Sequence, residues 1–164
     1  MFDTGLKRIT ERLSQALDRD ILIQNTANAL RNNLHVNRVV LYYFYRHWQG
    51  QVIYEAISSQ HFSILGSMGP DDCFNGEYAK LYEDGRLRAI NDINTEAITP
   101  CHRDFLLDLQ VRANLAAPIL NSKGLWGLLI AHHCQSSKSW TDLDIEEIKK
   151  SAAILEKAPA IQNS

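Results

Sequence analysis

The chain has 164 residues, of which 45% are hydrophobic and 22% charged, a composition typical of one soluble globular domain. Its formal net charge is −2 and no basic stripe with interleaved aromatic residues is present, which excludes an electrostatic surface for nucleic acid. No run of about 18 apolar residues occurs, so we expect no membrane contact. An odd number of cysteines, three, suits the reducing cytoplasm, where we place the protein.

Helical periodicity is found at both ends of the chain. Apolar residues recur at helical spacing in residues 4–18 and in the segment that begins at Ile21. Near the C-terminus the same spacing follows Thr141 and Asp142, either of which can cap a helix. We expect Pro159 to end or kink that last helix.

Four mainly apolar segments predict strands, the first of them rich in β-branched and aromatic residues. They form two hairpins, residues 39–45 and 52–56 around a turn at 48–51, and residues 115–120 and 125–131 around a turn at 121–124.

A long excursion, residues 59–109, separates the two hairpins. Within it we predict a helix over 76–82, a turn at Asp84-Gly85, a short strand over 87–90 and a helix after Pro100. The order of elements predicts an α+β fold: a central, mostly antiparallel sheet with helices on one face. The excursion would cover the other face and close a pocket there.

Two of the three cysteines lie inside this excursion. Cys73 follows a break at residues 66–70, and Cys101 follows Pro100 near the first turn of a helix. A helix N-terminus stabilises negative charge, so a thiol there is more readily a thiolate and a better nucleophile. We therefore predict that the fold brings both thiols to one cavity.

Each of these residues also has a structural explanation. A cysteine such as Cys73, Cys101 or Cys134 is often a small core residue. Tyr82 could simply pack a helix onto the sheet, and Asp71 could cap a turn. A metal or redox site is another alternative, for which the possible ligands are Cys73, Cys101, His102, His132, His133 and Cys134. No CxxC or HxxxH spacing preorganises such a site.

The element order resembles the GAF fold, a small-ligand sensor domain. Cys101-His102 resembles the bilin attachment site of phytochromes and cyanobacteriochromes, and Asp71-Asp72-Cys73-Phe74 resembles the signature of dual-cysteine cyanobacteriochromes. Further stretches resemble the same family over nearly the whole chain: Gly85-Arg86, residues 90–93, residues 112–115, residues 126–132 and Trp140.

This resemblance implies a role for each residue of the pocket. Cys101 would form a thioether to the A ring of a linear tetrapyrrole (bilin), and His102 would lie against the pyrrole rings. Asp71 would accept hydrogen bonds from pyrrole N–H groups. The remaining chromophore-binding residues would be Phe74, Tyr82, His132 and Arg103, the last as a partner for a propionate.

The resemblance also implies the function. Cys73 would add reversibly to the central methine bridge, so that light-driven Z/E isomerisation converts a blue- or violet-absorbing state into a green- or longer-wavelength-absorbing state. The chromophore would be phycocyanobilin or phycoviolobilin, which the sequence does not distinguish. The domain would attach its own chromophore without being a turnover enzyme. The alternative within the same fold is a regulatory domain that binds a cyclic nucleotide or another small metabolite.

The same resemblance extends to the organisation of the protein. We expect residues 1–164 to be a single GAF photosensory domain excised from a longer receptor, with an output domain as its signalling partner. The terminal helices, with Leu6, Ile9 and Leu13, could pair two chains as a homodimer.

Overall fold

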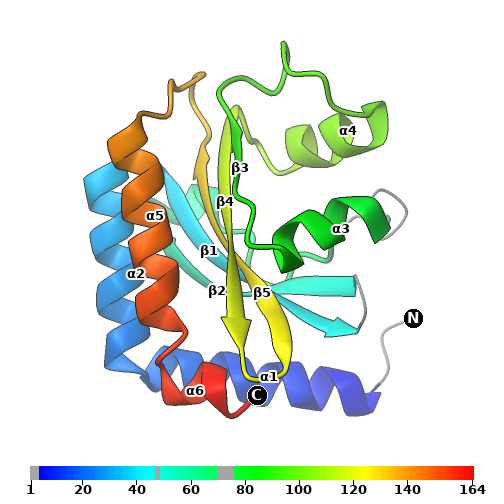
Figure 1. Cartoon of the computed structure of the whole chain (residues 1–164), viewed down its shortest axis with the longest axis vertical. Coiled ribbons are helices and arrows are strands. Elements are labelled where there is room, and N and C mark those ends of the chain that lie inside the picture. The colour runs from blue at the N-terminus through cyan, green and yellow to red at the C-terminus, as the bar shows by residue number, and fades with distance from the viewer. Residues whose placement is uncertain (1–3, 47–48, 70–75) are drawn as a thin grey trace.

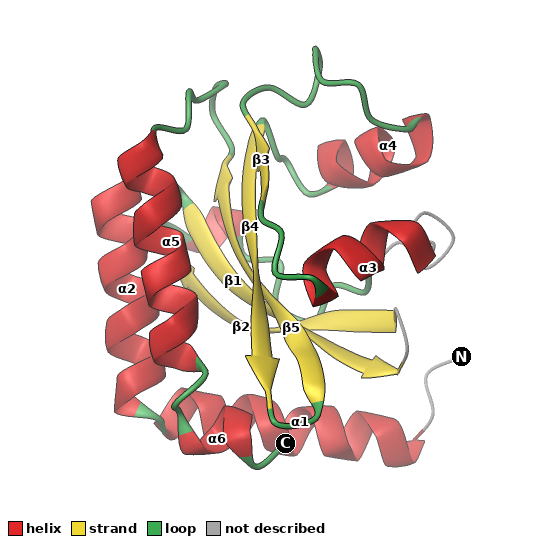
Figure 2. Ribbon diagram, in the orientation of Figure 1, coloured by secondary structure: helices red, strands yellow, loops and turns green. Residues whose placement is uncertain are grey.

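The computed structural model describes residues 4–46, 49–69 and 76–164, with the backbone but not the side chains of residues 76–79. A central sheet separates two groups of helices (Figures 1 and 2). The elements are α1 (Thr4–Arg19), α2 (Ile21–Leu34), β1 (Arg38–Arg46), β2 (Gln49–Ile57), η1 (Gln60–Phe62), α3 (Gly76–Glu83), β3 (Arg88–Ile90), α4 (Pro100–Asp108), β4 (Ala113–Asn121), β5 (Gly124–His133), α5 (Asp142–Leu155) and α6 (Pro159–Gln162).

The sheet has the order β2-β1-β5-β4-β3, and every neighbouring pair is antiparallel. Both predicted hairpins and the short strand of the excursion are confirmed. The predicted turn at 48–51 is wrong at its C-terminal part, because β2 already begins at Gln49 and Gly50 pairs with Phe44. A Cβ on Gly50 would lie 2.3 Å from the Tyr42 ring, so this glycine permits close packing within the sheet.

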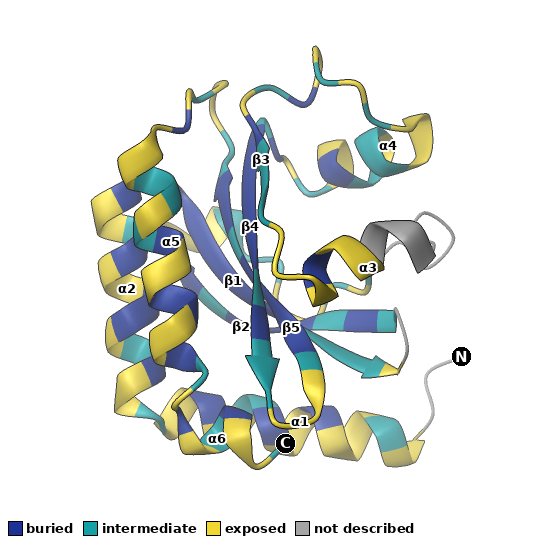
Figure 3. Ribbon diagram, in the orientation of Figure 1, coloured by how far each residue is buried: buried dark blue, intermediate teal, exposed yellow. Residues whose placement is uncertain are grey.

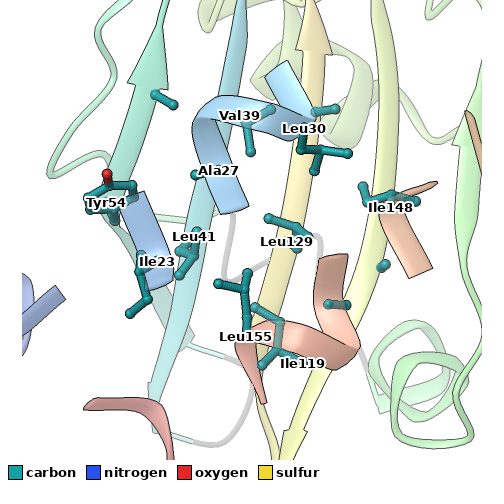
Figure 4. Close-up of a cluster of buried hydrophobic side chains, with 14 of the residues drawn as sticks. Ile23, Ala27, Leu30, Val39, Leu41, Tyr54, Ile119, Leu129, Ile148 and Leu155 are labelled. Carbon is teal, nitrogen blue, oxygen red and sulfur yellow. The ribbon is translucent and has the colours of Figure 1, made fainter. Parts of the chain in front are cut away.

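The two faces of the sheet bury different side chains, because successive residues of a strand point to opposite faces. Val39, Leu41 and Leu129 point to the face covered by α2 and α5, where the main core lies (Figure 4). Val40 and Leu128 point to the opposite face and join a separate, smaller cluster. Burial on both faces explains why the central strands are buried almost throughout (Figure 3).

The helix ends follow the capping residues of the sequence. The Asp20 side chain accepts hydrogen bonds from the backbone N–H groups of Leu22 and Ile23, which caps α2. Thr141 caps α5, and Asp144 completes a capping box with it. The prediction that Pro159 ends or kinks the last helix is wrong, since α5 ends at Leu155 and Pro159 starts α6. Proline suits a first helical turn because its missing N–H needs no partner there.

The excursion covers the second face of the sheet, as predicted. Its helices α3 and α4 lie on the side opposite α2 and α5 (Figure 1). Part of the excursion forms a small apolar cluster, in which Ile90, Ile93 and Leu106 pack with Val111, just after the excursion. The two helices therefore form a cover that is packed separately from the main core.

Candidate functional site

A mostly apolar cavity lies between the sheet and the helical cover, defined here as α3 and α4. The strands supply Val40, Tyr42, Val52, Arg88, Asn114, Ala116, Leu128, Ile130 and His132 to its wall. The cover and the adjoining loops supply Ile64, Ser67, Tyr82, His102, Phe105, Leu106 and Leu109. The free volume is about 60 Å³. A few polar groups thus converge in an apolar surrounding, which is the usual composition of a small-molecule site.

The first turn of α4 carries Cys101, which is not among the described residues that line the cavity but directly precedes His102, which is. Thr99 caps the helix through a hydrogen bond from the His102 backbone N–H to Oγ1 (3.2 Å), and Pro100 occupies the first helical position. This confirms the predicted helix start. Cys101 is exposed in the first turn and is disulfide-bonded in this structure. Once that disulfide is reduced, the helix dipole would favour a thiolate at this position.

His102, the neighbour of Cys101, lines the cavity and is half-buried. Burial lowers the pKa of His102, and the nearby positive charge of Arg88 lowers it further. The imidazole is therefore neutral at neutral pH and has one donor and one acceptor nitrogen.

His132 reaches the same cavity from β5 and is 3% exposed. Its Nδ1 accepts a hydrogen bond from the Nε of Arg38 across the strand pair, at 3.0 Å. Burial lowers the pKa of His132 well below its ordinary value, and the positive charge of Arg38 acts in the same direction.

Tyr82 lines the cavity from the C-terminal half of α3 and is 6% exposed. It belongs to the small cluster with Tyr42 and Val52 on the cavity side of the sheet. The structure thus brings together three predicted residues, Tyr82, His102 and His132, from three different elements.

Arg103 does not line the cavity. Its guanidinium donates hydrogen bonds to two backbone carbonyl oxygens of the preceding loop, those of Ile93 (3.0 Å) and Glu96 (2.8 Å). The arginine that lines the cavity is Arg88, on β3. Arg88 was not predicted as a site residue, although its place in the predicted short strand of the excursion was an available signal.

The remaining predicted residues, Asp71, Cys73 and Phe74, lie outside the described residues, so their meeting with Cys101 stays a prediction. The third thiol, Cys134, follows β5 and is half-buried. Burial raises the pKa of Cys134, and Arg38 partly offsets this effect. Among residues 4–46, 49–69 and 76–164, no group of three His, Cys, Asp or Glu side chains is placed to hold a metal ion.

An antiparallel sheet with a packed core on one face and a covered apolar cavity on the other defines a small-ligand-binding architecture. The family comparison makes this assignment specific. The sequence model of the family described as "GAF domain" matches residues 18–158 of this chain. The chain therefore belongs to the GAF family. The fold predicted from the sequence is thereby confirmed.

Two relatives show how such chains occur in cyanobacteria. An uncharacterized protein of Picosynechococcus sp. is 49% identical over 155 residues, which cover 94% of this chain and 95% of that protein. A putative methyl-accepting chemotaxis protein of Synechocystis sp. is 36% identical over 141 residues, which cover 86% of this chain but 14% of that protein. The same kind of domain is thus found in a protein of similar length and within a much longer one.

Three solved structures share the fold closely. The blue-light absorbing form of the Thermosynechococcus elongatus PixJ GAF domain has a TM-score of 0.71 and 27% identity, with 96% of this chain and 90% of that chain covered. The phycoerythrobilin-bound GAF domain of a cyanobacterial phytochrome has a TM-score of 0.77, 27% identity and coverage of 99% and 97%. The phycocyanobilin-bound GAF domain of a cyanobacterial phytochrome has a TM-score of 0.74 and 26% identity, with 95% of this chain and 93% of that chain covered.

In the described part of the chain, no helix combines the length and the apolar character that crossing a bilayer requires.

Proposed function

We propose that this GAF domain is a photosensory domain that binds a bilin covalently through Cys101 and belongs to the dual-cysteine class of cyanobacteriochromes. The observation that carries the proposal is the convergence of Tyr82, His102 and His132 on one apolar cavity, beside the helix start that bears Cys101. The likeness to GAF domains that bind phycocyanobilin and phycoerythrobilin supports a bilin as the ligand.

The cavity residues suit a bilin chemically. The walls are mainly aliphatic and aromatic, as extended conjugated rings require, and the imidazoles of His102 and His132 supply polar contacts. Arg88 lies at the cavity wall and forms an ion pair with Glu96 (Nη2 to Oε1, 3.8 Å). A propionate would pair with this guanidinium by sharing or replacing the Glu96 carboxylate.

The free volume requires a movement of the cover. Sites for drug-sized ligands measure roughly 300–1,000 Å³, whereas about 60 Å³ is free here. Because α3 and α4 are packed separately from the main core, they can move away from the sheet without opening that core. We infer that binding displaces the cover rather than the sheet.

Cys101 would act as the attachment nucleophile. A thiol reductant of the cytoplasm would first open the disulfide that Cys101 forms in this structure. The N-terminus of α4 would then stabilise the thiolate, which would form a C–S bond to the exocyclic carbon of the A-ring ethylidene group. The π electrons of that double bond go to the neighbouring ring carbon, which takes up a proton, so nothing leaves. The bound chromophore supplies visible absorption and photoisomerisation, and the domain need not act as a turnover enzyme.

Cys73, with Asp71 and Phe74, would supply the second, reversible thioether of this class. Cys73 would add to the central methine carbon and divide the conjugated system, which shifts absorption to the blue or violet. Light would release or restore that bond and give a green- or longer-wavelength-absorbing partner state. The blue-light absorbing form of the PixJ domain is the support for this choice of colours.

We also propose which chromophore the domain carries and in what kind of receptor it acts. The chromophore is phycocyanobilin, or phycoviolobilin formed from it in the pocket. A partner output domain in a cytoplasmic receptor would relay the signal, as the long chemotaxis relative suggests. Pairing of two copies through the terminal helices belongs to the same proposal.

Attachment is tested by producing the chain in cells that synthesise phycocyanobilin. The wild-type chain should keep its colour through denaturation in acid urea, and Cys101→Ala should lose the covalent adduct. Cys134→Ala is the matched control and should keep it. A Cys101→Ala chain that retains a denaturation-resistant bilin would overturn the assignment. A wild-type chain that binds no bilin would favour the small-metabolite alternative.

A further inference from the structure

Arg38 is a fully buried arginine that the proposed function does not use. Its exposed fraction is 0%, which is rare for this residue type. None of the ion pairs found in the described residues includes Arg38. Burial lowers the pKa of Arg38, while Cys134 and Glu55 act in the opposite direction. A guanidinium nevertheless stays protonated in proteins, so a cation is buried here.

The N–H groups of this guanidinium donate hydrogen bonds to acceptors in three different segments. Nε donates to Nδ1 of His132 on β5 (3.0 Å), Nη1 to the carbonyl oxygen of Phe62 in η1 (2.8 Å), and Nη2 to the carbonyl oxygen of Leu109 at the end of α4 (2.5 Å). The strand register places Arg38 directly opposite His132. Arg38 thus connects a cavity residue of the sheet to two segments next to the cavity.

The contact with His132 determines where that imidazole carries its proton. A guanidinium has N–H donors and no acceptor, so Nδ1 of His132 must present its lone pair. Nδ1 is then unprotonated, the ring is neutral, and its single proton resides on Nε2. Nδ1 is turned to Arg38, so Nε2–H is the group that His132 offers to the cavity.

We propose that Arg38 is a positioning residue that fixes His132 as an N–H donor, so that the pocket selects a ligand with a hydrogen-bond acceptor at this position. The proposal rests on the proposed function only for the identity of that ligand. The tautomer itself follows from the contact between the two side chains.

The groups around His132 support a ring that stays neutral. His133 follows it on β5 and Cys134 comes directly after that strand. Arg38 faces it from β1, and Asn114 pairs with it from β4. His102 from α4 and Arg88 from β3 line the same cavity. No Asp or Glu lies among the residues lining the cavity in the described part of the chain. Glu55, whose negative charge acts on Arg38, accepts hydrogen bonds from the Ser63 hydroxyl and the Ile64 backbone N–H. Burial and the charge of Arg38 therefore both disfavour a protonated His132.

The first test is the tautomer in the full chain without a chromophore. Histidine-selective ¹⁵N labelling and NMR distinguish a protonated from an unprotonated Nδ1, and His132→Gln assigns the signal. We expect His132 to show an unprotonated Nδ1, and not to titrate between about pH 8 and about pH 5. A protonated Nδ1 in the wild-type spectrum would overturn the proposal, and this result needs no variant to fold.

Two variants separate positioning from packing. Arg38→Lys keeps a side chain that can only donate, so His132 should keep its tautomer. Arg38→Gln offers an amide that can donate or accept, so the Nδ1–H form should appear and the pKa of His132 should rise towards its ordinary value. His102 is the internal control and should keep its tautomer. An unchanged His132 tautomer and titration in a folded Arg38→Gln chain would refute the role of Arg38.

The chromophore-loaded chain provides an independent measurement. The wild-type absorption band should stay constant between about pH 8 and about pH 5, whereas the band of Arg38→Gln should shift over this interval. Equal pH dependence of the two bands would count against the proposal. Failure of both chains to bind a bilin would refute the proposed function and leave the tautomer result intact.

Discussion

Trp140 donates its indole N–H to the backbone carbonyl oxygen of Ile90, 2.9 Å away, in a buried hydrogen bond between residues 50 positions apart. The backbone N–H of Trp140 also donates to the Asn91 side chain (3.1 Å). The segment before α5 is thereby fastened to β3, the edge strand that carries Arg88 at the cavity wall. Trp140, which does not line the cavity, thus helps to position the strand that supplies Arg88 to the cavity wall.

Replacing Trp140 with Phe should destabilise the chain by about 1–3 kcal/mol, because the Ile90 carbonyl loses its partner in a buried place. Urea unfolding followed by circular dichroism measures this change. Trp126→Phe is the matched control, since its indole N–H bonds to Ser164 at the half-buried C-terminus, where water can replace it. An equal loss in both variants would contradict the special role of the Trp140 contact.

The stability of the chain should fall as the pH is lowered through the ordinary histidine pKa. The folded-state pKa of His132 is depressed by burial and by Arg38, whereas the unfolded chain takes up its proton near pH 6.5. Below that pH the unfolded state binds more protons, so the free energy of unfolding decreases by at most about 1.4 kcal/mol per pH unit for this group. The loss continues until the pH reaches the folded-state pKa.

Urea unfolding at a series of pH values measures this slope. His132→Gln should reduce it, and an amide oxygen can still accept the hydrogen bond from Arg38. His102→Gln and His133→Gln are the comparisons. Their pKa values are also lowered by burial, but both side chains are less buried, so each should change the slope less. An unchanged slope in His132→Gln would show that folding does not lower the pKa of this histidine.

Bilin loading should alter the cover and leave the core unchanged. We expect hydrogen–deuterium exchange of backbone amides in α3 and α4 to differ between the loaded and the chromophore-free chain, since the free volume of about 60 Å³ demands a displacement there. Amides of β1 and β5, paired on both sides in the centre of the sheet, are the internal control. Exchange that changed in β1 and β5 but not in α3 and α4 would contradict a moving cover.

The sequence predicted the elements well because periodicity and capping are local signals. Helical spacing, the Thr141 cap and Pro100 each act within a few residues, and the structure has the corresponding helices. The predictions of a turn at residues 49–51 and of a helix end at Pro159 were wrong because glycine and proline each suit two different local structures. Gly50 can make a turn or allow close packing of Tyr42, and proline can end a helix or begin one.

Contacts between distant residues had no such local signal. Arg38 was not singled out because a charged residue next to a predicted strand normally faces solvent. Only the register of β1 and β5 reveals that it lies opposite His132, 94 positions away. Arg103 was chosen for its charge near Cys101, but its guanidinium donates to backbone carbonyl oxygens of the loop that precedes α4.

The two-thiol mechanism makes the sharpest prediction about the proposed function. Cys73→Ala should keep the bilin attached through Cys101 and strongly red-shift the ground-state absorption, because an undivided conjugated system has a smaller energy gap. The wild-type ground state should absorb in the violet to blue and convert under light to a green- or longer-wavelength-absorbing state. Spectra of both chains before and after the same illumination measure this difference.

Two further changes test whether Cys73 acts through its thiol. Iodoacetamide added during illumination should block the return to the blue state, by alkylating Cys73 once light has freed it. Iodoacetamide should block the return to the blue state in Cys134→Ala as it does in the wild type, which would show that the third thiol is not the target. Asp71→Ala should weaken the photoconversion without removing the bilin, because a carboxylate holds the pyrrole N–H groups by hydrogen bonds alone. A Cys73→Ala chain with an unchanged blue ground state would refute the second thioether and leave a bilin-binding GAF domain with one attachment cysteine.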